Sequence, residues 1–330
     1  MFYTKQSKAT QKRIHADYAE LFRRANSVFL AKLSAGLNRA KGSLDVQTPT
    51  FVHGNFHIGL ELSTEALANS ADLEFSDWGP WYVDLIRLES SALVAATLEG
   101  FRNFSPGQCL DAYVAGLDAA SKSQSLNWPT RESPKLLSTA KENLEFGDSL
   151  DSSDALLGPL KLYFTQNNLG TLEDVKVSGG SGRFVVFADD KRVWELREIS
   201  DSPLKDLSYS GRSSGIPACD RYKTAAELFG RPIPACLVAS GKSYALGIYV
   251  ASEPISWGTM EALLERKSRI CSNLAILHNK NWTPFDRRSL SLALRKNSTL
   301  GDRIHSVALE QSQILLEGYR MILDQKNGQN

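Results

Sequence analysis

The chain has 330 residues, 42% of them hydrophobic and 23% charged, which is the composition of a globular protein with one large or two ordinary domains. Lys and Arg total 38 and Asp and Glu total 37, for a net charge of +1. A balance this close to neutral excludes any general electrostatic reason to expect a nucleic acid or an anionic membrane as partner.

The apolar stretches and the cysteines bear on the cellular compartment. No stretch reaches the roughly 18 uninterrupted apolar residues of a membrane helix, since even residues 85–98 contain Arg87 and Glu89. No secretory signal precedes the four cysteines, which lack a zinc-binding spacing: Cys109, Cys219, Cys236 and Cys271. We therefore expect a cytoplasmic protein with reduced, buried cysteines.

The first 150 residues predict mainly helices. Residues 8–40 carry apolar side chains at helical spacing. Residues 48–58 predict a strand that runs into a loop, and residues 71–78 predict a second strand, which Gly79-Pro80 ends. Residues 81–99 have a helical apolar face, and Ser105-Pro106 starts a further helix that reaches residue 120.

The remaining residues predict a sheet followed by helices. Between residues 121 and 153 the composition shifts to Ser, Asn, Pro, Lys and Asp, which indicates a surface connection. Residues 171–199 predict a hairpin with its turn at 189–191, and strands are expected at 235–239 and 243–250, joined by Gly241-Lys242. Helical periodicity returns at 259–280 and 301–326. The expected units are 1–150, a sheet lobe at 151–255, and C-terminal helices at 256–330 that pack on the first unit.

Polar residues concentrate in HGNFHIGLE, residues 53–61, directly after the first expected strand. The segment LEFSDWGP follows and places Asp77 at the end of the second expected strand. A strand-end aspartate is a natural metal ligand, because the strand fixes its backbone while the carboxylate projects into an open cleft. Asn55 or His57 could complete such a site. The histidines His53 and His57 could equally cap or brace the loop.

The glycine-rich segment VSGGSGRFVVF, residues 177–187, suits phosphate binding. Glycines let the backbone approach a phosphate closely, and successive N–H groups bind anions, although such a segment can also be a simple turn. Neither the Rossmann nor the P-loop spacing is present. Arg197, in VWELREIS on the opposing strand, could contact phosphate or lie on a solvated strand face. The candidate phosphate-binding residues are Gly179, Gly180, Ser181, Gly182 and Arg197.

Four segments resemble, in their order, a bacterial family called domain of unknown function 2252, which is similar to aminoglycoside phosphotransferases and protein kinases. They are TPTFVHGNFHIG, LEFSDWGPWYVDLIRLESSALVAA, VSGGSGRFVVF and WELREIS, and the resemblance covers residues 48–280. Residues 79–91 match the family's Gly-Pro-x-x-x-Asp-Leu-x-Arg-Leu-x-x-Ser segment. The resemblance implies an α+β, protein kinase-like two-lobed fold with permuted lobe order, in which the mainly helical lobe precedes the small antiparallel sheet lobe.

The resemblance also implies an altered ATP and Mg²⁺ site. The family's first loop reads Gly-Asp-x-His-x-x-Asn, whereas residues 54–60 read GNFHIGL. Asn55 replaces the aspartate that would orient or deprotonate an acceptor hydroxyl, and Leu60 replaces the asparagine that would hold a second Mg²⁺. Asp77 matches the metal aspartate, and Arg197 stands where the family has a lysine.

Three further carboxylates and one cation have structural interpretations. Asp84 and Arg87 lie three residues apart on one helix face, so we expect an ion pair between them or a hydrogen bond from the loop to Asp84 rather than a chemical role. Glu227 is a candidate helix partner for Arg197, and Glu198 or an unrelated residue could equally fill that place.

The favoured function is a kinase-like, pseudokinase-like module that binds a nucleotide or another phosphate-bearing small molecule, with Asn55, His57 and Asp77 at an impaired catalytic centre. A protein partner is a further option. One alternative is an active ATP- and Mg²⁺-dependent phosphotransferase that acts on a small molecule or a protein. Another is a metal-dependent hydrolase with His53, His57 and Asp77 as ligands.

Overall fold

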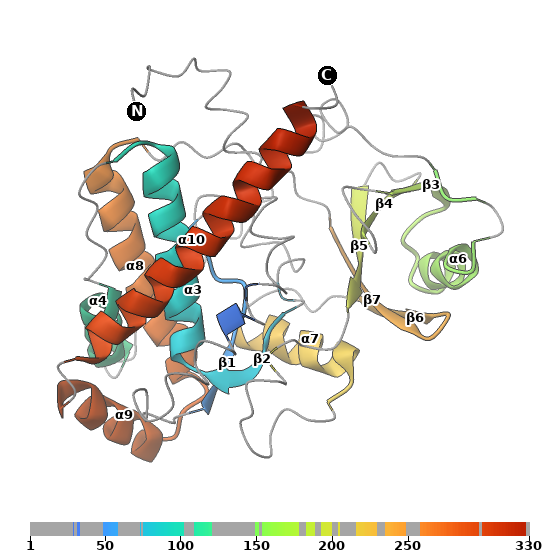
Figure 1. Ribbon diagram of the computed structural model, residues 1–330. Coiled ribbons are helices and arrows are strands. Elements are labelled where there is room, and N and C mark those ends of the chain that lie inside the picture. Colours follow the sequence, from blue (N-terminus) through green and yellow to red (C-terminus); the bar gives the residue numbers. More distant parts are fainter. Residues whose placement is uncertain are drawn as a thin grey trace.

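The structure is a computed structural model, and it describes residues 29, 32–33, 49–58, 73, 75–101, 109–120, 149–151, 154–177, 183–188, 193–199, 204, 216–229, 235–248, 258–296 and 299–327. The fold is α+β, with helices gathered on one side and a sheet on the other (Figure 1). The described elements, in chain order, are β1 (Pro49–Val52), β2 (Asp77–Pro80), α3 (Tyr82–Leu98), α4 (Cys109–Ala120), α6 (Leu157–Gln166), β3 (Leu172–Val177), β4 (Arg183–Ala188), β5 (Val193–Ile199), α7 (Ala218–Leu228), β6 (Ala235–Ala239), β7 (Lys242–Ile248), α8 (Met260–Asn279), α9 (Pro284–Lys296) and α10 (Leu300–Asn327).

Strands β1 and β2 form a two-stranded antiparallel sheet that joins two distant segments. Its register pairs Pro49 with Pro80 and Val52 with Asp77. The strand expected at 71–78 therefore begins only at Asp77, and Gly79-Pro80 continues the strand instead of breaking it. Pro80 is tolerated because it is the last residue of a strand in a narrow sheet, where a missing N–H costs little.

Helix α3 is the centre of the helical part. Every residue from Tyr82 to Ala96 is buried, and α10 packs across this helix (Figure 1). Helices α4 and α8 lie against each other so closely that a Cβ added at Gly116 would stand 2.8 Å from Ser272 Cα. Cys109 and Cys271 form a disulfide between these two helices, which corrects the expectation of reduced cysteines for this pair, although both are buried as expected. Cys219 and Cys236 are free thiols, as expected, but they are partly exposed and not buried.

The larger sheet is antiparallel, with the strand order β3-β4-β5-β7-β6. The hairpin expected within 171–199 is confirmed by the pairing of β4 with β5, and its turn at 189–191 lies outside the described residues. Strands β6 and β7 are joined at Ser240 and Gly241, whose φ angles of 51° and 76° fit a type I′ turn. Such a turn matches the natural twist of the two strands.

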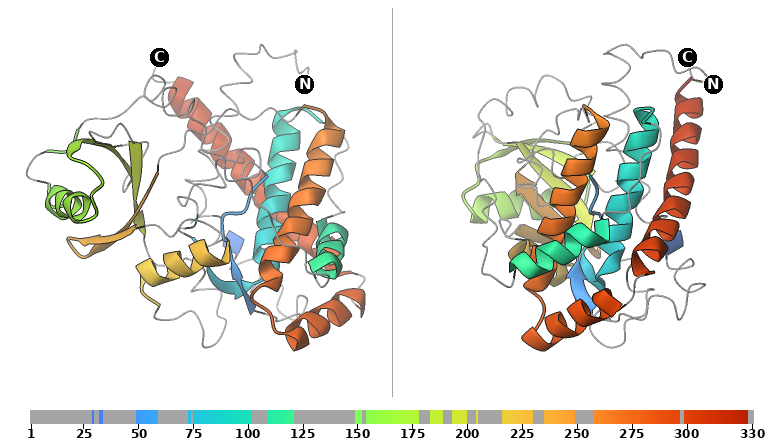
Figure 2. Two further views of the ribbon diagram at one scale, coloured as in Figure 1. Left: turned by 180° about the vertical axis from the view of Figure 1, so that it is seen from behind. Right: turned by 90° about the vertical axis from the view of Figure 1, so that its left-hand side faces the viewer.

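The two faces of this sheet have different coverings. Helix α6, which the sequence patterns do not predict, packs on the face that carries Trp194 and Leu196, and its Phe164 ring lies 5.7 Å from the Trp194 ring. Helix α7 lies between the sheet and the helical part (Figure 2). Ile199 and Tyr222 belong to the same apolar core as α3, so the sheet, α7 and the helices pack together.

None of the described helices has both the length and the apolar character needed to cross a membrane.

Candidate functional site

The loop at residues 53–58 lies next to Asp77, as the sequence analysis expects. The β1–β2 register brings them together, because the loop begins directly after Val52 and Val52 pairs with Asp77. Gly54 allows the close approach: its φ is +74°, and a Cβ there would collide with the backbone of Phe75. The loop and Asp77 thus form the centre of the candidate site.

Asp84 on α3 holds this loop from inside the protein. Its fully buried carboxylate accepts hydrogen bonds from the backbone N–H groups of His53, at 2.7 Å, and Gly54, at 2.8 Å. The expected hydrogen bond between Asp84 and the loop is therefore confirmed. Because both donors are backbone groups, the carboxylate sets the path of the loop rather than the position of one side chain.

Two residues from other helices extend this network, and the sequence analysis missed both. His278 on α8 places Nε2 3.1 Å from Asp84 Oδ2, and its Nδ1 lies 2.8 Å from the hydroxyl of Tyr113 on α4. The His278 ring therefore bridges the Asp84 carboxylate and the Tyr113 hydroxyl. Burial, reinforced by the Asp84 charge, raises the pKa of Tyr113 well above its usual range, so the phenol stays protonated.

Asn55 points inward, toward α3. It is fully buried, and its Oδ1 accepts a hydrogen bond of 3.2 Å from Arg87 Nη2. The Arg87 guanidinium also lies 4.3 Å from the centre of the Phe29 ring, a cation–π contact. Asn55 Nδ2 has no hydrogen-bond partner among the described residues. Arg87 thus contacts the loop through Asn55, while Asp84 makes the hydrogen bonds to the loop that were one of the two expectations.

Asp77 is 2% exposed, and its Oδ1 accepts a hydrogen bond of 2.8 Å from the backbone N–H of Trp78. The preceding residue, Ser76, donates from Oγ to His53 O at 3.0 Å. Its carbonyl accepts from Arg221 Nη1 on α7 at 2.6 Å. These contacts tie the approach to Asp77 to both the loop and α7, and Arg221 is a further residue that the sequence analysis missed.

The two histidines of the loop, His53 and His57, are buried in the protein interior. His53 is 4% exposed and packs edge-on against the rings of Phe56 and Phe229, at 5.3 and 5.2 Å. His57 is also buried. Within the described part of the chain, no group of three or more His, Cys, Asp or Glu side chains is placed to hold a metal ion. The arrangement of His53, His57 and Asp77 therefore gives the hydrolase alternative no support.

Arg197 lies on β5 and its acidic partner is Glu195, two residues earlier on the same strand face. Arg197 Nη2 is 3.2 Å from Glu195 Oε1, and both side chains are buried. The two other candidate partners have different positions, because Glu198 pairs with Lys242 at 2.9 Å and Glu227 is exposed on α7. Of the three alternatives, the structure therefore supports a partner other than Glu227 and Glu198.

The glycine-rich segment lies outside the described residues, so its four candidate residues are not placed: Gly179, Gly180, Ser181 and Gly182. The strands on either side of it are described. They pair with each other, with Val177 opposite Phe184. Leu60, the substituted metal position, also lies outside the described residues.

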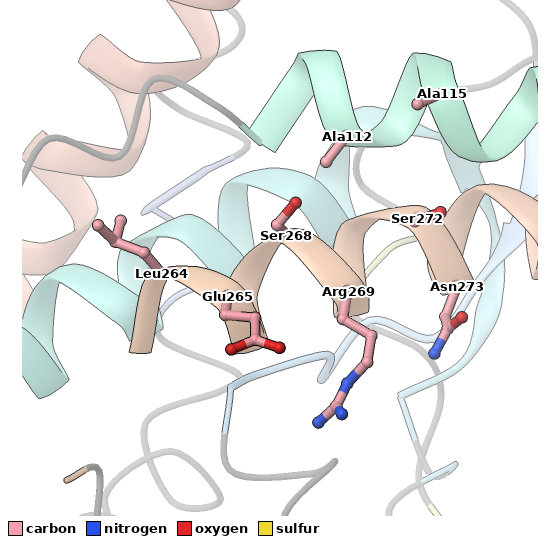
Figure 3. Close-up of a pocket in the computed structure, with 8 residues that line it drawn as sticks. All are labelled: Ala112, Ala115, Leu264, Glu265, Ser268, Arg269, Ser272 and Asn273. Carbon is pink, nitrogen blue, oxygen red and sulfur yellow. The ribbon is translucent and has the colours of Figure 1, made fainter. Parts of the chain in front are cut away.

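An open groove of about 540 Å³ lies apart from these residues, between α4 and α8 (Figure 3). Ala112 and Ala115 line it from α4, and Ser268 and Arg269 line it from α8. Of the candidate residues that the structure describes, neither Asp77 nor Arg197 lines this groove.

Comparisons of the chain with protein families, with curated protein sequences and with solved structures found no match.

Proposed function

We propose that this chain is a kinase-like protein that binds a nucleotide or a related phosphate-bearing small molecule and has lost most phosphoryl-transfer activity. The observation that carries the proposal is the position of Asp77 beside the loop 53–58, with that loop held by Asp84. A metal-binding aspartate beside an acceptor-orienting loop is the arrangement that phosphoryl transfer in kinases requires.

The larger sheet supports a phosphate site. In protein kinases a glycine-rich hairpin covers the nucleotide phosphates, and a cation on the next strand contacts them. Here the paired strands β3 and β4 flank the glycine-rich segment, and Arg197 lies on the next strand, β5. Helix α7 follows before β6 and packs on the side of the sheet that faces the helical part. We propose on this basis that the fold is kinase-like with its lobe order permuted.

The donor chemistry of Asp77 suits Mg²⁺ bound together with a nucleotide. Mg²⁺ is a hard cation that proteins commonly hold through one or two carboxylates plus substrate phosphates, rather than in a cage made only of side chains. Asp77 would supply the carboxylate and ATP the phosphate oxygens. Bound Mg²⁺ would neutralise charge on the phosphates.

Asn55 supports the loss of activity. An amide cannot take a proton from an acceptor hydroxyl at neutral pH, and the Asn55 amide oxygen is already bonded to Arg87. The replacement of Asn by Leu60 at the second metal position acts in the same direction, because leucine cannot ligate a cation. In this proposal the protein therefore keeps nucleotide binding but loses phosphoryl transfer.

The test is a calorimetric titration of ATP into the full chain, with and without Mg²⁺, for the wild type, Asp77→Asn and Asp118→Asn. Asp118 is a matched control because it is an exposed aspartate on α4, outside the candidate site. We expect Mg²⁺-dependent binding in the wild type and Asp118→Asn, and its loss in folded Asp77→Asn.

Two outcomes would change the conclusion. Absence of ATP binding under all conditions, or unaltered binding by Asp77→Asn, would contradict a nucleotide site at Asp77. Mg²⁺-dependent ATP turnover by the wild type that Asp77→Asn abolishes would replace the proposal with the active phosphotransferase.

A further inference from the structure

Two cysteines outside the candidate site lie together where α7 meets the edge of the larger sheet. Cys219 is the second residue of α7, and Cys236 is the second residue of the edge strand β6. The Cys236 thiol donates to the Cys219 carbonyl oxygen, with the sulfur 3.8 Å from the oxygen. Both cysteines carry free thiols and are partly exposed.

The sheet register explains why these side chains meet. Cys236 pairs with Ala245, and Ala245 also pairs with Arg197 on the other side, so the three residues share one face of the sheet. That face is the one toward α7, since Ala245, Cys236 and Cys219 all pack on the core shared with the helices. The contact is therefore built by two elements of regular structure.

The surroundings of the two thiols suit a stepwise oxidation. Cys219 lies in the first turn of α7 and is partly exposed, so a small oxidant can reach its thiol. Burial and the contact with Cys219 raise the pKa of Cys236. The charge of Asp220 raises it further, whereas the charge of Lys223 lowers it. The raised pKa makes Cys236 the slower thiol to react, so we expect Cys219 to react first and the neighbouring Cys236 second.

We propose that Cys219 and Cys236 are an oxidisable dithiol, in which a small disulfide oxidant such as oxidised glutathione closes a disulfide between α7 and β6. The Cys219 thiolate attacks one sulfur of the oxidant and releases a first glutathione thiolate, which takes up a proton. Cys236 then loses its proton and attacks the Cys219 sulfur of the mixed disulfide, which releases the second glutathione. The cysteine pair loses two electrons, and the oxidant is reduced to two thiols.

The bond would constrain a helix that contacts both parts of the protein. Two residues after Cys219, Arg221 donates to the Ser76 carbonyl, immediately before Asp77. Tyr222 is buried in the core shared with the helices. A disulfide at Cys219 would therefore fix the first turn of α7 to the sheet edge, while Arg221 in the same turn fixes it to the helical part. This site does not depend on nucleotide binding.

The experiment treats the folded full chain with oxidised glutathione, blocks remaining thiols by alkylation and maps tryptic peptides without reduction. Cys219 lies in peptide 213–221 and Cys236 in peptide 224–242, so their disulfide joins these two peptides. The disulfide already present joins peptides 103–122 and 270–280 and serves as an internal standard. We expect loss of both free thiols, a new link between 213–221 and 224–242, and an unchanged standard.

Two variants control the result. In Cys236→Ser, Cys219 should stop at the mixed disulfide with glutathione, and in Cys219→Ser the link should be absent. Amide hydrogen exchange in α7 should be slower in the oxidised wild type than in Cys236→Ser treated in the same way. Glutathione adducts that persist on the wild type without the link, unreacted thiols, or a link to Cys109 or Cys271 would overturn the proposal.

Discussion

The buried polar groups of the helical part and those of the larger sheet are held in different ways. In the helical part, the Asp84 carboxylate joins the loop after β1 to α3, and through His278 and Tyr113 it also joins α8 and α4. In the sheet, the buried pair Glu195–Arg197 lies within one strand. A network between distant segments is shared by several elements, whereas a pair within a strand is local. Substitutions of buried polar residues should therefore lower the free energy of unfolding most in the helical part.

The largest expected effect is that of Asp84→Ala. The change leaves two buried backbone N–H groups and His278 without their acceptor, and each such loss costs about 1–3 kcal/mol. We expect the free energy of unfolding to fall by about 4 kcal/mol, measured by urea denaturation. Asp118→Asn, at an exposed position 3.8 Å from Arg295, should change it by less than about 0.5 kcal/mol. Equal stability of the two variants would contradict the structural role of Asp84.

The next effect concerns helix contacts in the two regions. Gly116→Ala puts a methyl group against Ser272 and should lower the free energy of unfolding by about 2 kcal/mol through overpacking of α4 on α8. Gly158 lies on α6, which covers the sheet, and no heavy atom of the described residues lies within 4 Å of the position that its Cβ would take. Gly158→Ala should therefore be neutral or stabilise by up to about 1 kcal/mol through helix propensity. Thermal melts of both variants measure this difference in stability. A destabilised Gly158→Ala together with an unaffected Gly116→Ala would contradict the prediction.

A smaller effect is expected in the sheet from Glu195→Gln. The amide keeps an oxygen that can accept from Arg197 but removes the charge, so we expect a loss of about 1–2 kcal/mol in the free energy of unfolding. Glu173→Gln, at an exposed position on β3, is the control and should have little effect. A loss as large as that of Asp84→Ala would show that the sheet pair, too, supports distant elements.

The smallest effect should appear as a pH dependence at the contact of α10 with α3. His305 Nδ1 lies 2.8 Å from Glu89 Oε1, and this hydrogen bond raises the pKa of His305. A raised histidine pKa means that the stabilisation is complete below the ordinary value of about 6.5 and is lost as pH rises through the folded-state pKa. His305 is one-third exposed, so the gain is small.

The comparison of wild type with His305→Gln measures this effect. Their difference in free energy of unfolding should shrink as pH rises above about 6.5. Asp302 strengthens the charged form of His305, whereas Lys267 on α8 weakens it. Burial lowers the pKa of Lys267 to about 8. The titration of His305 should therefore be measured below that pH, where Lys267 keeps its charge. A difference that grows with pH would contradict the assigned direction.

The sequence by itself determined much of the local structure. Apolar residues at helical spacing predicted α3, α8 and α10, and alternating residues predicted the β4–β5 and β6–β7 hairpins, because both periodicities are properties of short segments. The neighbourhood of the loop 53–58 and Asp77 was also expected, as was the hydrogen bond from that loop to Asp84. The kinase-like function and the permuted lobe order of the fold stay predictions.

Only the tertiary structure decided which distant groups meet. His278 reaches Asp84 across 194 positions of sequence, and Arg221 reaches Ser76 across 145, distances at which no periodicity carries information. The structure also selected Glu195 as the partner of Arg197, because the two residues share one face of β5, whereas Glu198 lies on the opposite face and pairs with Lys242. Local spacing determines which face a side chain occupies, but the packing of that face decides what it touches.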